Sequence, residues 1–193
     1  MIIIGVAGTI GAGKETLTSF FRNKGFVYFE TSAILKEILA KEGKEITREN
    51  MQNLGDELRR KEGIGALMKI MLEKALKDTS KNYIFDSLRN DGEAEFLRKN
   101  CDKFFLVAVD APREIRFKRI LARNKQHDPK TWKEFLKVDE RDLHDKENHL
   151  GQQTAKLLKM ADFVIINDSS LDKAMKQVEE IWRKIHEKLS IKG

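Results

Sequence analysis

A glycine-rich segment near the N-terminus carries the clearest chemical signal in the sequence. It fits the pattern G-x-x-x-x-G-K and reads Gly8-Thr9-Ile10-Gly11-Ala12-Gly13-Lys14. Glycines let successive backbone N–H groups turn toward a phosphate, and a helix that follows adds positive potential from its N-terminus. The lysine ammonium then reaches the outer phosphates of a nucleotide. The segment therefore predicts a nucleotide phosphate site.

The position after Lys14 departs from the usual pattern. Glu15 and then Thr16 stand where a serine or threonine hydroxyl ordinarily ligates Mg²⁺. Carboxylate oxygen is a preferred ligand of Mg²⁺. One hypothesis is that Glu15 reaches Mg²⁺ directly or through a water, while Thr16 hydrogen-bonds the α-phosphate. The alternative is that Glu15 points to solvent and that phosphates and waters alone hold the metal.

A second set of polar residues follows the apolar run Tyr83-Ile84-Phe85. Asp86 comes directly after this run, and Arg89 follows three residues later. An acid at the tip of a buried strand can hold the water shell of Mg²⁺, so Asp86 and Glu15 are the candidate metal residues. A guanidinium at the same sheet edge suits the phosphate of a second substrate. As isolated residues, both would otherwise be solvated loop side chains.

Residues 112–125 form a basic segment with six lysines and arginines against one acid. On a helix, Arg116, Arg119 and Arg123 lie on one face. Such arginines can neutralise charge on a phosphoryl group in transfer, and Arg141 can approach from the far side. The alternative roles of these arginines are a solvated basic helix face or a surface that binds RNA.

The aromatic residues of this region argue against nucleic acid as the main partner. Phe117, Trp132 and Phe135 have the spacing of residues in a helical core rather than of an exposed stacking platform. Nucleic acid binding through the basic segment therefore stays a secondary interpretation.

The elements that must position these residues alternate along the chain. Short apolar runs predict buried strands, and helical spacing of apolar residues separates them. Strands too far apart for hairpins indicate an α/β fold with a parallel sheet. The predicted strands span residues 2–7, 26–29, 83–85, 104–109 and 163–166.

Composition narrows the class of protein. The 193 residues contain two prolines and no linker-like stretch, so we expect one domain over residues 1–193. No apolar run is long enough to span a membrane. Cys101 is the only cysteine, which excludes an internal disulfide and argues against a cysteine-based zinc site. A net charge of +6 suits a polyanionic partner. We expect a cytoplasmic monomer or homodimer.

The motifs together resemble the nucleoside monophosphate kinase family of P-loop proteins. Dephospho-CoA kinase is a near relative of this family. The resemblance rests on residues 8–16 with Asp86-Ser87-Leu88-Arg89, and on the R-I-x-x-R lid motif at Arg119–Arg123. A looser match places residues 31–36 on the acceptor-binding helix, with Lys36 in place of an arginine. Residues 128–135 and 161–167 are similar to archaeal dephospho-CoA kinase-like proteins.

The resemblance implies a three-layer P-loop kinase fold with a five-stranded parallel sheet, an acceptor-binding helical segment at 31–79 and a helical lid at 113–145. It implies transfer from Mg·ATP to a small phosphorylated acceptor. The residues expected to bind ATP are Gly8, Thr9, Ile10, Gly11, Ala12, Gly13, Lys14, Glu15, Thr16 and Asn167. The expected acceptor-binding residues are Thr31, Lys36 and Arg89, and the expected catalytic residues are Lys14, Asp86, Arg119, Arg123 and Arg141. Asn167 begins a loop toward the donor base, and Asp168 is expected to cap the last helix.

The chemistry of the acceptor separates the alternatives. A phosphate monoester is already ionised, whereas a ribose hydroxyl benefits from a carboxylate base, which dephospho-CoA kinases carry as an acidic pair after the second strand. Here that segment holds Glu30 and no acidic pair. This favours a nucleoside or deoxynucleoside monophosphate as acceptor. Dephospho-CoA, with Glu30 as base, is the first alternative, and an RNA- or ribosome-associated ATPase is the second.

Overall fold

The computed structural model describes residues 1–125, 128–146, 148 and 151–190. Each predicted apolar run forms a strand whose ends differ from the prediction by no more than one residue. All five strands are parallel, in the order β2-β3-β1-β4-β5. Their bounds are β1 (Ile3–Gly8), β2 (Val27–Glu30), β3 (Tyr83–Asp86), β4 (Phe104–Asp110) and β5 (Phe163–Ile166). The predicted α/β class and the five-stranded parallel sheet are confirmed.

The central strand β1 delivers the glycine-rich segment to the carboxyl edge of the sheet. All six residues of β1 are buried, and β3 and β4 pair with it on either side. The register places Val6 opposite Asp86 and Gly8 opposite Val109. Ligands of open parallel sheets bind at this edge, beside strands whose connections leave in opposite directions. The candidate residues after β1 and β3 therefore lie at adjacent strand ends.

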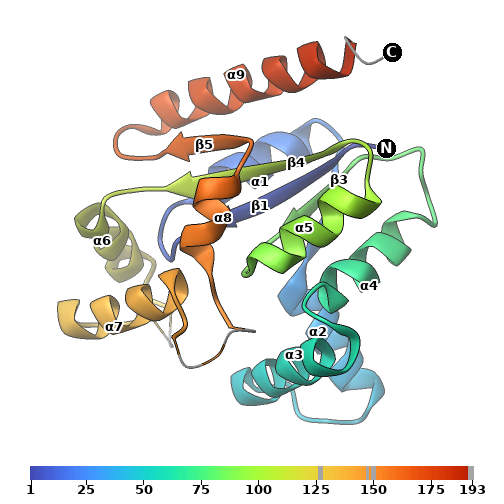
Figure 1. Cartoon of the computed structure of the whole chain (residues 1–193). Coiled ribbons are helices and arrows are strands. Elements are labelled where there is room, and N and C mark those ends of the chain that lie inside the picture. Colours follow the sequence, from blue (N-terminus) through green and yellow to red (C-terminus); the bar gives the residue numbers. More distant parts are fainter. Residues whose placement is uncertain (126–127, 147, 149–150, 191–193) are drawn as a thin grey trace.

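Helices cover both faces of the sheet and complete three layers (Figure 1). Helices α1 (Lys14–Asn23) and α9 (Leu171–Ser190) pack on one face, where Phe21, Val178 and Ile185 are fully buried. The other face carries α4 (Ala66–Ala75), α5 (Asp91–Asn100) and α8 (Thr154–Met160), with Met68 and Leu97 in its core. Burial on both faces explains why the strands read as continuous apolar runs.

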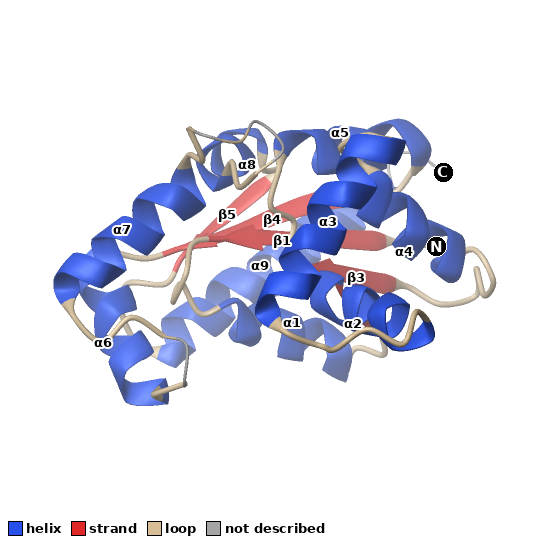
Figure 2. Cartoon of the chain, turned by 90° about the horizontal axis from the view of Figure 1, so that it is seen from below, coloured by secondary structure: helices blue, strands red, loops and turns tan. Residues whose placement is uncertain are grey.

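The remaining helices lie around the carboxyl edge (Figure 2). Residues 31–79 contain α2 (Thr31–Lys41), α3 (Arg48–Glu62) and α4, beside the edge strand β2. Residues 113–145 contain α6 (Arg113–Arg123) and α7 (Trp132–Leu143), and their residues 126–127 lie outside the described part. The sheet thus has one group of helices on each side of the glycine-rich segment.

The aromatic residues of α6 and α7 pack against one another. The ring centroids of Phe117, Trp132 and Phe135 lie 5.2–5.4 Å apart, and Phe135 is fully buried. The packing agrees with the core spacing inferred from the sequence, although the Trp132 side chain stays partly exposed. These rings join the two helices and do not form a stacking platform.

The start of α9 corrects one expectation. Asp168 was the expected cap, but the helix begins at Leu171, and the Lys173 N–H donates to the Ser170 Oγ at 3.4 Å. Ser170 directly precedes the helix and its hydroxyl reaches the N3 position, which is the geometry of a cap. Within the described residues, no helix has both the length and the apolar character needed to cross a membrane.

Candidate active site

The glycine-rich segment forms a loop between β1 and α1. Gly11 has φ +77° and Gly13 has φ +89°, a backbone region that side chains with a Cβ rarely adopt. Lys14 is the first residue of α1, so the loop ends at the helix N-terminus. The first N–H groups of a helix have no acceptor in their own helix and favour an anion. The loop has the geometry of a phosphate site.

Substituting Gly13 with alanine is expected to weaken ATP binding by at least about tenfold, because a Cβ would collide with the Asn167 amide nitrogen that braces the loop. Gly25→Ala is a matched control, since Gly25 has φ +84° and no atom within 4 Å of an added Cβ. Both variants carry the same backbone strain. Nucleotide titration of the two variants checks the prediction, and equal affinities would contradict it.

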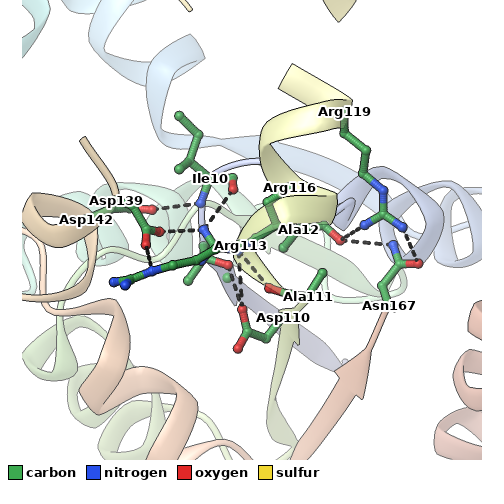
Figure 3. A network of polar contacts seen from close by, with 12 residues as sticks. Ile10, Ala12, Asp110, Ala111, Arg113, Arg116, Arg119, Asp139, Asp142 and Asn167 are labelled. Carbon is green, nitrogen blue, oxygen red and sulfur yellow. Dashed lines mark hydrogen bonds and ion pairs between the residues drawn. The ribbon is translucent and has the colours of Figure 1, made fainter. Parts of the chain in front are cut away.

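Two side chains from distant elements hold the loop from outside (Figure 3). The Ala12 carbonyl accepts hydrogen bonds from the Asn167 Nδ2 at 2.9 Å and from the Arg119 Nη1 at 3.2 Å. The Arg119 Nη2 also donates to the Asn167 Oδ1 at 3.0 Å. Arg119, expected as a catalytic residue of the lid, and Asn167, expected at the donor site, therefore meet at the same loop carbonyl.

Ile10 is held on both of its backbone groups (Figure 3). Its carbonyl accepts from the Arg116 Nη1 at 3.2 Å, and its N–H donates to the Asp142 Oδ2 at 2.9 Å. Arg116 was expected on one helix face with Arg119 and Arg123, but it turns inward, is nearly fully buried and pairs with Asp139. Its guanidinium thus supports the loop instead of facing solvent.

The Lys14 ammonium lies at the start of the loop. Its Nζ donates to the Gly8 carbonyl at 3.1 Å. Burial and the nearby Arg89 cation together lower the pKa of Lys14 to about 8, even though Asp86 and Asp142 act in the opposite direction. The lysine, both acids and the arginine therefore share one electrostatic environment. A bound triphosphate would favour the charged lysine.

Asp86 is buried at the end of β3. It accepts hydrogen bonds from the Tyr28 hydroxyl and from the Ser87 N–H, both at 2.6 Å. Burial and this bond raise the pKa of Tyr28. Ser87 has φ +68°, a strained backbone angle for serine that bends the chain directly after Asp86. The carboxylate is thereby fixed at the sheet edge.

The donor set for a divalent cation is small. A carboxylate oxygen has two lone pairs, so Asp86 can accept further bonds from the water shell of Mg²⁺. Glu15 is exposed and accepts from the Ser19 Oγ at 3.1 Å. In the described part of the chain no three acidic, histidine or cysteine residues gather as a metal cluster. Nucleotide phosphates would have to supply the other ligands, as is usual for Mg²⁺ in kinases.

Arg89 is anchored through its backbone and paired through its side chain. Its N–H donates to the Glu93 Oε2 at 2.7 Å, and its carbonyl accepts from the Gln153 N–H at 2.7 Å. Its guanidinium donates to the Asp142 Oδ1 at 3.0 Å and is about one third exposed. Arg59 of α3 pairs with Glu93 at 3.3 Å, and its side chain is 12% exposed.

Sequence reasoning missed Arg59 and Asp142. The Arg59 guanidinium contacts Asp56 at 3.4 Å and Glu93 at 3.3 Å, but its buried Nε has no hydrogen-bond partner in the described residues and remains free to donate to an acceptor. Asp142 joins Arg89 to the glycine-rich loop. The one sequence signal for Asp142 is the spacing of three acids, Asp139, Asp142 and Asp145, on one face of a helix.

The other expected residues lie further from these contacts. Arg123 forms a two-point pair with Asp128 at 2.7 and 2.8 Å. Arg141 is mostly exposed, with its Nε 3.5 Å from Asp145. Thr31 is buried at the start of α2, Lys36 is exposed on the same helix, and the Thr16 N–H donates to the Gly13 carbonyl. The structure thus brings together the loop, Asp86, Arg89, Arg119 and Asn167, but in this arrangement not Lys36 or Arg141.

Comparison with known proteins gives the family. A family model described as an AAA domain matches residues 4–145. A UPF0200 protein of Thermococcus onnurineus is 32% identical over 189 residues, covering 96% of this chain and 98% of the relative. The chain belongs to the UPF0200 family of AAA-domain proteins. A second UPF0200 protein, from Thermococcus gammatolerans, is 33% identical and covers 96% and 95% of the two chains.

Solved structures show that the UPF0200 chain has the fold of P-loop kinases. A shikimate kinase from Bacteroides thetaiotaomicron superposes with a TM-score of 0.60 over 96% of this chain and 98% of that one, at 16% identity. A gluconokinase from Sinorhizobium meliloti gives 0.61 over 100% and 97%, at 13% identity. A dephospho-CoA kinase from Campylobacter jejuni gives 0.55 over 95% and 96%, at 16% identity. The resemblance inferred from the motifs is confirmed for the fold.

Proposed function

We propose that the chain transfers the γ-phosphoryl group of Mg·ATP to a small phosphorylated acceptor. One observation carries this proposal. The Asp142 carboxylate bridges the Ile10 N–H of the phosphate loop and the guanidinium of Arg89. A donor phosphate on the loop and an acceptor phosphate on Arg89 would therefore lie on either side of one carboxylate, so that an acceptor held by Arg89 could approach the donor for direct transfer.

The proposed donor site is the loop, residues 8–16, braced by Arg119 and Asn167. Lys14 would pair with the outer phosphates, and Asp86 would hold the water shell of Mg²⁺, which neutralises phosphate charge when bound. A metal contact of Glu15 stays a prediction. Residues 113–145 are proposed as a lid over the donor, from which Arg123 and Arg141 would approach the transferring group once their pairs with Asp128 and Asp145 open.

The proposed acceptor site lies between residues 31–79 and Arg89. Glu93 contacts both the Arg59 guanidinium and the Arg89 backbone N–H, so Arg59 is proposed as a further cation on this side of the site, although Asp56 and Glu93 already pair with it. A nucleoside or deoxynucleoside monophosphate is the acceptor expected from the sequence, because Glu30 was the only acid found after the second strand that could act as a base. Asp142 is a further carboxylate that could act as a base. It therefore favours, as a second candidate, a phosphorylated acceptor with a hydroxyl group, such as dephospho-CoA.

The RNA alternative loses its main support. Arg116 is buried against Asp139, Arg119 contacts the loop, and Arg123 is paired with Asp128. These arginines therefore do not form a free stripe on the described surface. A small-molecule acceptor accounts better for their inward contacts.

A product screen by mass spectrometry tests the proposal. Purified protein and Mg·ATP are incubated with every nucleoside and deoxynucleoside monophosphate, with dephospho-CoA, and with the phosphate-free acceptors shikimate and gluconate. A phosphorylated product from a phosphate-bearing acceptor is expected. Products from the phosphate-free compounds alone would contradict a phosphorylated acceptor, and ADP with free phosphate as the only products would contradict the kinase.

ATP affinity is expected to fall as the pH rises above about 8. The pKa of Lys14 is lowered to about 8, so in the free protein the ammonium is mostly charged at neutral pH and loses its proton above that value. Phosphates bind the charged form, so the Kd should rise by up to about tenfold per pH unit above the pKa. Fluorescence titration across this range measures the slope. Lys14→Arg stays charged throughout and should give a flat profile, and equal slopes would contradict the assignment.

A further inference from the structure

We propose that Asp142 is the general base of the transfer and that the nucleophile of the acceptor is a hydroxyl group. This inference rests on the proposed phosphoryl transfer and adds to it the acceptor atom. No motif singled out Asp142, and its role follows from its place between the loop and Arg89.

Three buried acids lie on the inward face of the segment that starts with α7. Asp139 is balanced by Arg113 and Arg116 of α6. Asp145 contacts Arg141 and the segment that follows, through the Asn148 N–H. Of the three, Asp142 is the one that the described contacts bring to the phosphate loop. Its position is therefore not explained by joining α7 to α6.

The Asp142 carboxylate is held at two points and retains acceptor capacity. One oxygen accepts from the Ile10 N–H at 2.9 Å, and the other accepts from the Arg89 guanidinium at 3.0 Å. Each carboxylate oxygen can accept two bonds, so each has one more to offer. The side chain is 4% exposed, so its orientation is fixed by protein groups and not by bulk water.

The carboxylate contacts the loop through the Ile10 N–H, near the start of the glycine-rich turn. Ile10 precedes Gly11 and Gly13, whose positive φ angles shape the cradle, and the Ile10 carbonyl is held by Arg116. An acid here would repel a triphosphate unless cations compensate it, and Arg89 together with Lys14 supplies them. The space between the donor phosphate and Arg89 is where the nucleophile of an acceptor must lie.

The chemistry of the step balances without a further reactant. The acceptor hydroxyl donates a hydrogen bond to Asp142, and its oxygen forms a bond to the γ-phosphorus. The bond from that phosphorus to the β-phosphate oxygen breaks, and ADP leaves with its electron pair. The hydroxyl proton passes to Asp142 and then to water. Because the transition state is loose, a weak base suffices. An ionised phosphate acceptor would need no such group.

Asp142→Asn is the deciding variant, because the amide keeps the shape and one hydrogen-bond acceptor but takes up no proton. Asp142→Ser is a second variant that also removes the base, and Asp142→Glu restores a carboxylate. Glu140→Gln is the matched control, since Glu140 is exposed on the same helix and loses the same charge. Each variant is assayed below its melting temperature for ATP affinity, for single-turnover hydrolysis of Mg·ATP by water, and for products in the acceptor screen.

Loss of the base is expected to slow both transfer and hydrolysis by about 10²-fold or more in the Asn and Ser variants, with ATP affinity nearly unchanged. The Glu variant should recover part of the rate, and Glu140→Gln should match the wild type. Unchanged turnover in the Asn variant would overturn the inference. So would tighter ATP binding with turnover retained, which would mean that Asp142 only stands in for a phosphate.

The screen separates the two proposals. A diphosphate product from a nucleoside monophosphate would contradict the role of Asp142 as a general base, because the nucleophile would then be an ionised phosphate. The proposed kinase activity would remain supported. A phosphorylated hydroxyl whose formation depends on Asp142 supports both. If the wild type yields no phosphorylated product, the proposed function fails, and the inference falls with it.

Discussion

Lys14→Ala is expected to reduce phosphoryl transfer by about 10³-fold, because it removes the ammonium that, in the proposed mechanism, pairs with the outer phosphates. In the free protein that ammonium is desolvated and is left with the Gly8 carbonyl at 3.1 Å. A triphosphate offers it far better partners, so the lysine would stabilise both the bound donor and the charge that develops during transfer.

Initial rates with the acceptor from the product screen, together with ATP titration, measure this loss. Lys24→Ala is the matched control, because Lys24 lies at the other end of α1 and is exposed. It should retain wild-type rates. A Lys14→Ala protein with more than about a tenth of wild-type turnover would show that the loop is not used as proposed.

The same substitution is not expected to destabilise the fold at neutral pH. The pKa of Lys14 is about 8 in the folded protein and about 10.5 when unperturbed, so the unfolded chain binds more protons between those values. Stability of the free protein therefore rises with pH in that window, and the charged lysine opposes folding below it. Melting curves should show Lys14→Ala no less stable than the wild type at pH 7, so a lost rate would not report unfolding.

The strands and the glycine-rich loop of the site were predictable because their sequence signals are local. The glycine spacing of residues 8–14 and the apolar runs that become strands are properties of short segments, and parallel pairing then brings the ends of β1 and β3 together. Short-range patterns of this kind are sufficient to place Asp86, Arg89 and Lys14 at one edge of the sheet.

The groups that join the elements were not predictable in the same way. Asp142 and Ile10 are 132 residues apart in sequence, and Arg59 and Glu93 are 34 apart. Helical spacing grouped Arg116 with Arg119 and Arg123 on one face of α6. It could not predict that Arg116 pairs with Asp139, because Asp139 lies on another helix. The argument for a monophosphate acceptor searched for a base after β2, whereas the structure supplies a carboxylate from α7.

Asp139→Ala is expected to destabilise the fold strongly. Asp139 is fully buried and pairs with both Arg113 and Arg116, and Arg116 is itself nearly fully buried. Removing one partner of a buried pair leaves an uncompensated charge and costs about 3–5 kcal/mol. For a domain of this size the melting temperature should fall by roughly 10 °C.

Asp128→Ala provides the comparison, because it breaks the more exposed pair with Arg123 and should cost less than about 1 kcal/mol. Calorimetry of both variants measures the difference, and similar melting temperatures would contradict the role given to Asp139.

The double variant Asp139→Leu with Arg116→Met removes both buried charges and should regain much of the stability. It would still lack the guanidinium that holds the Ile10 carbonyl. Weak ATP binding in a stable double variant would therefore show that Arg116 supports the loop for binding, independently of its contribution to the stability of the fold.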